Sequence, residues 1–234
     1  MSQDPPPASG ATDTDTTGAG DDAPLEPPRN ALERALVRLV RGIEHVSDAA
    51  GAVSALLVLV VFVVGIVNVA LRYLGRWTEQ SLTNNTWIES QWYLFGAIFL
   101  LGFPWVLKEQ INPRVDFWYA GYSARRKAWI DFVGHLIFLV PFCFVALRIL
   151  WDPILTSFGR RPDGSFPTWK VWEIWEQSPD AGGLPRAPIK GAIYVGFVLL
   201  GLQAVAEVIK AGFVVVGRDH LVPRKERVAP LRIE

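Results

Sequence analysis

The stretch AAGAVSALLVLVVFVVGIVNVAL, residues 49–71, decides the fold of this 234-residue chain. It holds 23 residues without a charge and consists mainly of Val and Leu. A helix of this length rises about 1.5 Å per residue and measures roughly 34 Å, enough to cross a hydrocarbon core of about 30 Å. A soluble domain would spread its apolar residues at helical or strand spacing, whereas here they form one block. The stretch therefore predicts a transmembrane helix.

Three further apolar blocks follow, and we expect them to span the membrane at about residues 87–107, 131–151 and 191–216. Backbone polar groups within lipid must be satisfied inside the segment, so each block is expected to be a helix. The alternation of residues that a membrane barrel requires is absent from the sequence. The predicted fold class is an all-α integral membrane protein with four transmembrane helices.

The charges around these blocks predict their orientation. The flanks and loops that would share the side of the two termini carry fourteen Lys and Arg residues, against seven on the other side. Basic residues favour the cytoplasmic side, so both termini are expected in the cytoplasm. We expect residues 29–218 to form the membrane domain, residues 1–28 a disordered acidic tail, and residues 219–234 a basic cytoplasmic tail.

The composition also excludes several functions. Lys and Arg together number 23, as do Asp and Glu, and this zero net charge gives no reason to expect a nucleic-acid partner. The single cysteine, Cys143, permits neither a disulfide framework nor a thiolate metal site. The sequence contains no phosphate-binding loop, paired-histidine zinc motif or nucleophile elbow. We therefore expect no cofactor, no metal and no enzymatic activity.

Residues 30–48, ahead of the first span, have the pattern of an amphipathic helix. Asn30 is suited to cap this helix, and Glu33 favours its positive start. One face carries Leu32, Leu36, Leu39 and Ile43, and another carries Arg34, Arg38 and Arg41. This pattern predicts a separate helix lying on membrane lipid at the cytoplasmic surface. The alternative is a continuous extension of the first span into water.

A long loop, residues 152–190, is expected on the outer side. Its six prolines argue against a long helix. Trp169, Trp172 and Trp175 recur every third residue and would share one face of a short helix. An aromatic belt at the membrane surface is the favoured interpretation, and a docking face for a partner is the alternative.

Ionisable residues within spans are costly and are functional candidates by default. Arg72 ends the first span and Glu89 begins the second, so the two are expected to pair near the outer surface. Arg148 and Asp152 are four residues apart at the outer end of the third span, which places them on one helix face. A structural ionic cluster that ties these helix ends together is favoured over a substrate site.

A second polar stripe lies on the fourth span, where Gln203, Glu207 and Lys210 follow one another at helical spacing. Lys210 is near enough to the cytoplasmic end to extend toward the surface. Glu207 lies deeper and needs a partner, either Lys210 or a helix of another subunit. No chain of further acids or histidines continues from it, so a proton relay is not expected.

The order of several short motifs from about residue 31 to residue 216 resembles the small permease subunit of tripartite ATP-independent periplasmic (TRAP) transporters. The match rests on Arg72-Tyr73, Trp87-Ile88-Glu89, Trp92-Tyr93-Leu94-Phe95, Gly102, Arg114-Val115-Asp116, Trp129-Ile130-Asp131, Gly182-Gly183-Leu184-Pro185, Lys190 and Gln203. One departure is Asn112-Pro113, which stands where the family often has a histidine. A role for such a histidine does not carry over to this chain.

The resemblance implies a subunit of the bacterial inner membrane that braces a large permease subunit. In this family a periplasmic binding protein delivers a solute, commonly a carboxylate, and the large subunit transports it with an ion gradient. The candidates for structural or interface roles are Arg72, Trp87, Glu89, Asp116, Arg148, Asp152, Gln203 and Glu207.

Two other interpretations remain open. A membrane anchor of a redox or quinone-linked complex is suggested by His135, the tryptophans and the number of spans, although a second intramembrane histidine for haem is lacking. A self-assembling channel is suggested by the polar stripe on the fourth span alone.

Overall fold

The computed structural model describes residue 28, residues 30–111 and residues 121–222. Within these ranges the chain is helical and contains no strand. The long elements are α1 (Ala31–Thr78), α2 (Asn85–Glu109), α4 (Ala124–Gly134), the π-helical turn η1 (His135–Leu139), α5 (Val140–Ser157) and α6 (Ala187–Val215). Two 3₁₀ turns, η2 (Val171–Glu173) and η3 (Asp219–Leu221), complete the described elements.

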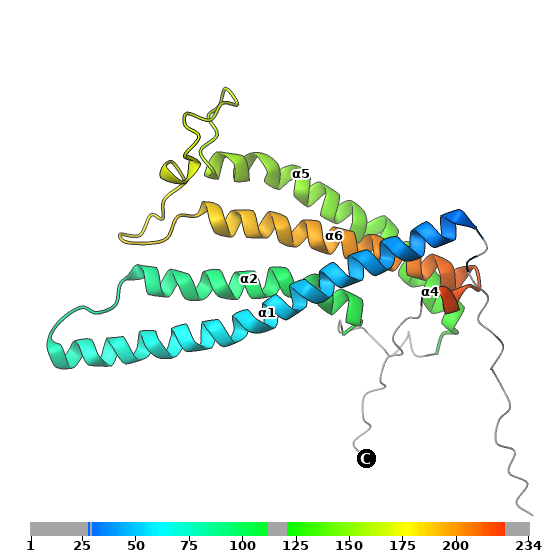
Figure 1. Ribbon diagram of the computed structural model, residues 1–234, viewed down its shortest axis with the longest axis horizontal. Coiled ribbons are helices and arrows are strands. Elements are labelled where there is room, and N and C mark those ends of the chain that lie inside the picture. Colours follow the sequence, from blue (N-terminus) through cyan, green and yellow to red (C-terminus); the bar gives the residue numbers. More distant parts are fainter. Residues whose placement is uncertain (1–27, 29, 112–120, 223–234) are drawn as a thin grey trace, which may run out of the picture.

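In the described ranges, four helices are long and apolar enough to cross a membrane, which confirms the predicted fold class. They are α1, α2, the continuous run α4–η1–α5 from Ala124 to Ser157, and α6. In Figure 1, α6 lies in the middle of the bundle, with α5 along one side and α2 along the other. The long α1 packs chiefly on α2 and reaches α6 with its N-terminal part.

The segment before the first span is helical, but the prediction of a separate interfacial helix is wrong. Residues 31–48 and the apolar block 49–71 form one uninterrupted helix of 48 residues. The sequence between them contains no proline and no residue in a left-handed conformation, so nothing breaks the backbone hydrogen bonding. The alternative of a continuous extension is the one observed.

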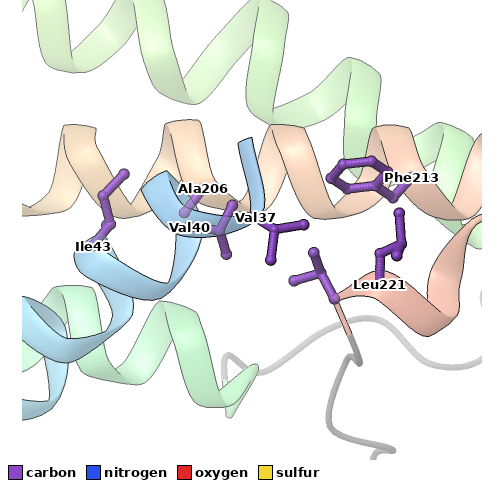
Figure 2. Close-up of a cluster of buried hydrophobic side chains, with 7 residues drawn as sticks. Val37, Val40, Ile43, Ala206, Phe213 and Leu221 are labelled. Carbon is purple, nitrogen blue, oxygen red and sulfur yellow. The ribbon is translucent and has the colours of Figure 1, made fainter. Parts of the chain in front are cut away.

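The buried face of this extension agrees only in part with the predicted apolar face. Leu32 and Leu39 of that face are exposed, while its Leu36 packs against the core. The buried residues are Val37, Val40 and Ile43, of which Ile43 belongs to the predicted face. Figure 2 shows that these three residues of α1 face α6 and the turn η3. The cluster consists of Val37, Val40, Ile43, Ala206, Phe213, Leu221 and Val222, which we call the inner core. Leu221 and Val222 thus pack into the bundle although the basic tail was expected to begin at residue 219.

Small residues allow the helices to approach closely. A Cβ atom at Gly51 of α1 would lie 2.6 Å from the Trp105 ring of α2. A Cβ atom at Gly196 of α6 would lie 2.8 Å from the Cβ of Leu100 in α2. Small residues of this kind are typical of helix contacts in membranes, where packing replaces the hydrophobic effect as the driving force.

A π-helical turn interrupts the third span just before Pro141. Proline lacks an N–H group and cannot bond to the carbonyl four residues earlier. The backbone shifts register over His135–Leu139, where the N–H of Val140 bonds to the carbonyl of His135. The span nevertheless continues through the proline as one helix from Ala124 to Ser157.

Candidate functional site

Glu89 lies in the first turns of α2 and is only 3% exposed. Its carboxylate accepts hydrogen bonds from the hydroxyl of Ser178 and from the backbone N–H of Leu184. Both donors belong to the loop of residues 158–186, which we call the outer loop after its predicted side of the membrane. A buried carboxylate is costly unless it accepts hydrogen bonds, and here the loop supplies both donors. Glu89 therefore anchors the loop to α2.

Neighbouring side chains of α2 extend this anchor, which we call the outer clasp. It consists of Asn85, Thr86, Glu89 and Tyr93 on α2 and residues 178–185 of the loop. The Asn85 amide donates to the carbonyl of Ala181 at 3.0 Å, and the Thr86 hydroxyl donates to that of Gly182 at 2.5 Å.

Gly183 is required at the centre of the outer clasp. A Cβ atom at this position would lie 2.5 Å from the Cβ of Ser178 and 2.7 Å from a carboxylate oxygen of Glu89. Gly182, directly before it, has a φ of 72°, a conformation that favours glycine. The Gly-Gly pair thus lets the loop backbone come within hydrogen-bonding distance of Glu89.

A second set of contacts fastens the other part of the loop to α5 and α6. The carboxylate of Glu176 bonds to the ammonium of Lys190 and accepts the Ser157 hydroxyl at 2.5 Å. The backbone N–H of Glu176 donates to the carbonyl of Ser157, and the Glu176 carbonyl accepts the N–H of Arg186. The hydrogen bond from Lys190, followed by that from Ser157, lowers the pKa of Glu176 below the ordinary value.

The predicted pairing of Arg72 with Glu89 is wrong. Arg72 is exposed on α1, and no ion pair joins it to Glu89 in the described part of the chain. The carboxylate of Glu89 is turned toward the outer loop, whose serine and backbone donors take the place expected for the guanidinium. Trp87, in the first turn of α2, is half-buried.

Arg148 and Asp152 lie on one face of α5, as their spacing predicts, with a closest distance of 3.9 Å. Asp152 makes a closer contact with Arg160, at 2.6 Å. These residues are separate from the outer clasp, so the four outer charges do not form a single cluster. Asp116 lies outside the described residues.

The three loop tryptophans do not share a helix face. The only regular structure around them is η2, which is three residues long. Trp169 and Trp172 are exposed and contact each other edge to face, with ring centroids 5.6 Å apart. Trp175 packs inward against Phe158.

At the opposite end of the bundle, the polar stripe of α6 takes part in a buried network. Gln203 and Glu207 are fully buried, and Lys210 is 3% exposed. The amide of Gln203 accepts the Ser47 hydroxyl at 2.7 Å and donates to Glu207 at 3.0 Å. The ammonium of Lys210 bonds to Glu207 and, at 2.9 Å, to Glu44.

The inner network therefore joins α1, α6 and the end of α2, where Gln110 donates to Glu207 at 3.3 Å. We define the inner network as Glu44, Ser47, Gln110, Gln203, Glu207 and Lys210. Glu207 has the predicted lysine partner, but Lys210 does not extend to the surface as expected. It is retained inside because Glu44 of the continuous helix α1 provides a second carboxylate.

Several of these hydrogen-bond and ion-pair partners were not predicted from the sequence. Ser47 and Glu44 lie on the buried stripe of α1 that also contains Val40 and Ile43, and this 3-to-4 residue spacing could have indicated them. Ser178 lies in an irregular loop about ninety residues from Glu89. No local pattern could have indicated that contact.

His135 contacts the helix backbone and is not grouped with other metal-ligating side chains among the described residues. Its Nδ1 atom lies 2.6 Å from the carbonyl of Asp131 in the preceding helical turn. Among the described residues, no group of three or more His, Cys, Asp or Glu side chains is arranged to hold a metal ion.

Comparison with protein-family models matches residues 61–212 to the family described as tripartite ATP-independent periplasmic transporters, DctQ component. Searches of curated proteins and of solved structures gave no match. The matched range covers more than half of the chain and includes all of the outer clasp and the α6 residues of the inner network. The chain therefore belongs to the DctQ family and is a small membrane subunit of a TRAP transporter.

Proposed function

We propose that this subunit braces the large permease subunit during ion-gradient-driven uptake of an organic acid, which a periplasmic binding protein delivers. The family match over residues 61–212 carries this proposal. We place the subunit in the bacterial inner membrane with residues 29–218 as its membrane domain and both termini in the cytoplasm, in agreement with the bias of basic residues.

The bonding of the buried polar groups supports a bracing role. Glu89 bonds to the outer loop, and Gln203, Glu207 and Lys210 bond to one another and to α1. A buried ionic network that is satisfied within the chain fixes the register of the helices. We therefore assign Glu89, Gln203 and Glu207 to the stability of this subunit rather than to solute recognition.

The outer half of α1 is the face that we propose for the large subunit. Only a narrow stripe of this half packs against α2, whereas Leu59, Phe62 and Ile66 are more than half exposed. Gly65 lies in an apolar groove of about 520 Å³ together with Val61, Phe62, Ile66, Val69 and Ala70. A glycine in such a groove allows a helix of another chain to pack closely.

The first test is a pull-down of the tagged subunit from its own cells in mild detergent, followed by mass spectrometry. We expect a large multi-helix permease in near-equal amount. Recovery of redox subunits, or of the tagged chain alone, would contradict the proposal.

A second test separates bracing from transport. Proteoliposomes that contain the purified subunit alone are expected to show no solute uptake under an ion gradient, whereas proteoliposomes with the large subunit and the binding protein take up solute. Uptake by the subunit alone would rule out a purely accessory role.

A further inference from the structure

A groove of about 630 Å³ lies between the outer halves of α5 and α6, apart from the outer clasp and from the proposed face of α1. It is lined by Phe144, Leu147, Arg148, Trp151, Asp152 and Tyr194. Five of these residues belong to α5, and Tyr194 of α6 closes the groove by packing its ring against Trp151, with centroids 5.6 Å apart.

The guanidinium of Arg148 is only partly neutralised by the part of the chain that the structure describes. Its side chain is 72% exposed although it lies in a membrane span, and among the described residues its one ion pair, with Asp152, is 3.9 Å long. The other oxygen of Asp152 bonds to Arg160 at 2.6 Å, so one carboxylate serves two guanidinium groups. An arginine near the end of a span is stabilised when its guanidinium reaches an anionic partner at the membrane surface.

Polarity changes along the groove in one direction. Phe144 lies one helical turn deeper than Arg148, and Asp152 lies one turn further toward the outer end of α5. Trp151 and Tyr194 flank the polar end, where aromatic rings are typical of headgroup depth. The apolar end thus lies within the bilayer and the cationic end at its surface, which is also the orientation of a lipid in a leaflet.

We propose that this groove binds a glycerophospholipid, with the phosphate on Arg148 and an acyl chain along Phe144 and Leu147. The forked guanidinium fits two phosphate oxygens, and basic sites between transmembrane helices are suited to lipid headgroups. The excess of one positive charge among Arg148, Arg160 and Asp152 matches the single negative charge of a phosphodiester. The proposal does not depend on which solute the transporter carries.

Native mass spectrometry of the full chain tests this proposal after reconstitution into vesicles of phosphatidylethanolamine and phosphatidylglycerol and extraction in mild detergent. We expect wild type to retain one phospholipid per chain, and Arg148→Gln to retain it about tenfold less, because charge-assisted hydrogen bonds to the phosphate are lost. Arg161→Gln is the matched control, because Arg161 is an exposed outer-loop arginine outside the groove. Equal retention by wild type and Arg148→Gln would overturn the proposal.

Further measurements of competition and crosslinking distinguish a bound lipid from other occupants of the groove. Phe144→Ala is expected to weaken lipid retention, and excess inorganic phosphate is expected not to displace the lipid, because the acyl chain contributes to binding. Displacement by phosphate alone would identify a simple anion site and overturn the proposal. A photocrosslinker at position 144 is expected to capture phospholipid in native membranes, and capture of another polypeptide in its place would equally overturn it.

Discussion

At the level of single residues, the two most deeply buried carboxylates in the described part of the chain are those of Glu89 and Glu207, which lie at opposite ends of the bundle. Glu89 accepts hydrogen bonds from a loop, and Glu207 bonds to a lysine one turn away on its own helix. Each is held inside the chain because its oxygens have donors there, which offsets the cost of removing the charge from water. Their substitution should therefore change stability and assembly, while solute preference stays unchanged.

Gly183→Ala tests the outer clasp. The added Cβ would clash with Ser178 and the Glu89 carboxylate, so the loop must move away from α2. We expect a loss of about 1–3 kcal/mol, typical of overpacking, and faster cleavage at Arg186 in limited trypsin digestion. Gly121→Ala is the control, since a Cβ there has no neighbour within 4 Å. Identical digestion of the two variants would show that the clasp does not hold the loop.

The inner network predicts an order of stabilities among three variants. Lys210→Leu removes the ammonium that bonds to both Glu44 and Glu207, with an expected cost of about 3 kcal/mol. Glu207→Leu leaves Lys210 bonded to Glu44 and should cost less. The double variant Glu207→Leu/Lys210→Leu should be more stable than Lys210→Leu alone, because it leaves no unpaired carboxylate at position 207. Thermal denaturation in detergent measures the order, and a double variant that is the least stable of the three would contradict a compensating charge pair.

Glu176 predicts a pH dependence of the outer loop. Its pKa is lowered in the folded chain, chiefly by the hydrogen bond from Lys190, from an ordinary value of 4.5. Its contribution to stability is therefore present above pH 4.5 and is lost as the pH falls through the lower folded-state pKa. The difference in melting temperature between wild type and Glu176→Gln should shrink as the pH falls below this value. A difference that is unchanged across the acid range would exclude this linkage.

At the level of elements, the four spans could be predicted because each contains a long apolar block with few charges, and hydropathy reports such blocks directly. The ends of α5 and α6 extend past the predicted spans, to Ser157 and from Ala187, since helices continue beyond the hydrocarbon. The apolar face of residues 31–48 was predicted only in part, because this segment has two apolar stripes. Only the three-dimensional position of α6 decides that Val37 and Val40, not Leu32 and Leu39, are covered.

Gly65→Leu tests the proposed interface on α1. A Cβ atom at Gly65 has no neighbour within 4 Å among the described residues, so we expect the subunit to fold normally while the leucine fills the groove. We expect at least a severalfold loss of the large permease subunit from the pull-down. Gly42→Leu is the matched control, because Gly42 lies on the same helix, is equally unobstructed and is outside the groove. Equal loss in both variants would indicate a general effect on α1 rather than a specific interface.

At the level of the whole molecule, the two ends of the bundle are held together differently. The end with the inner core and the inner network joins α1, α6 and η3 through packed side chains (Figure 2). At the other end, α1 diverges from α5 and α6, as Figure 1 shows, and hydrogen bonds from the outer loop hold α2, α5 and α6 together. This asymmetry leaves the outer half of α1 with α2 as its main neighbour within the chain. A second subunit could pack there without disturbing the inner core.

The orientation of this asymmetric bundle is the last prediction. The single native cysteine, Cys143, is buried, so it should react poorly and serve as the background. Ser165 in the outer loop and Ser123 before α4 are both exposed and lie on opposite sides of the third span. The bias of basic residues predicts that a membrane-impermeant maleimide labels Ser165→Cys in spheroplasts, and labels Ser123→Cys only after the membrane is opened. The reverse pattern would place the outer clasp and the lipid groove on the cytoplasmic side, where a periplasmic binding protein could not reach the loop.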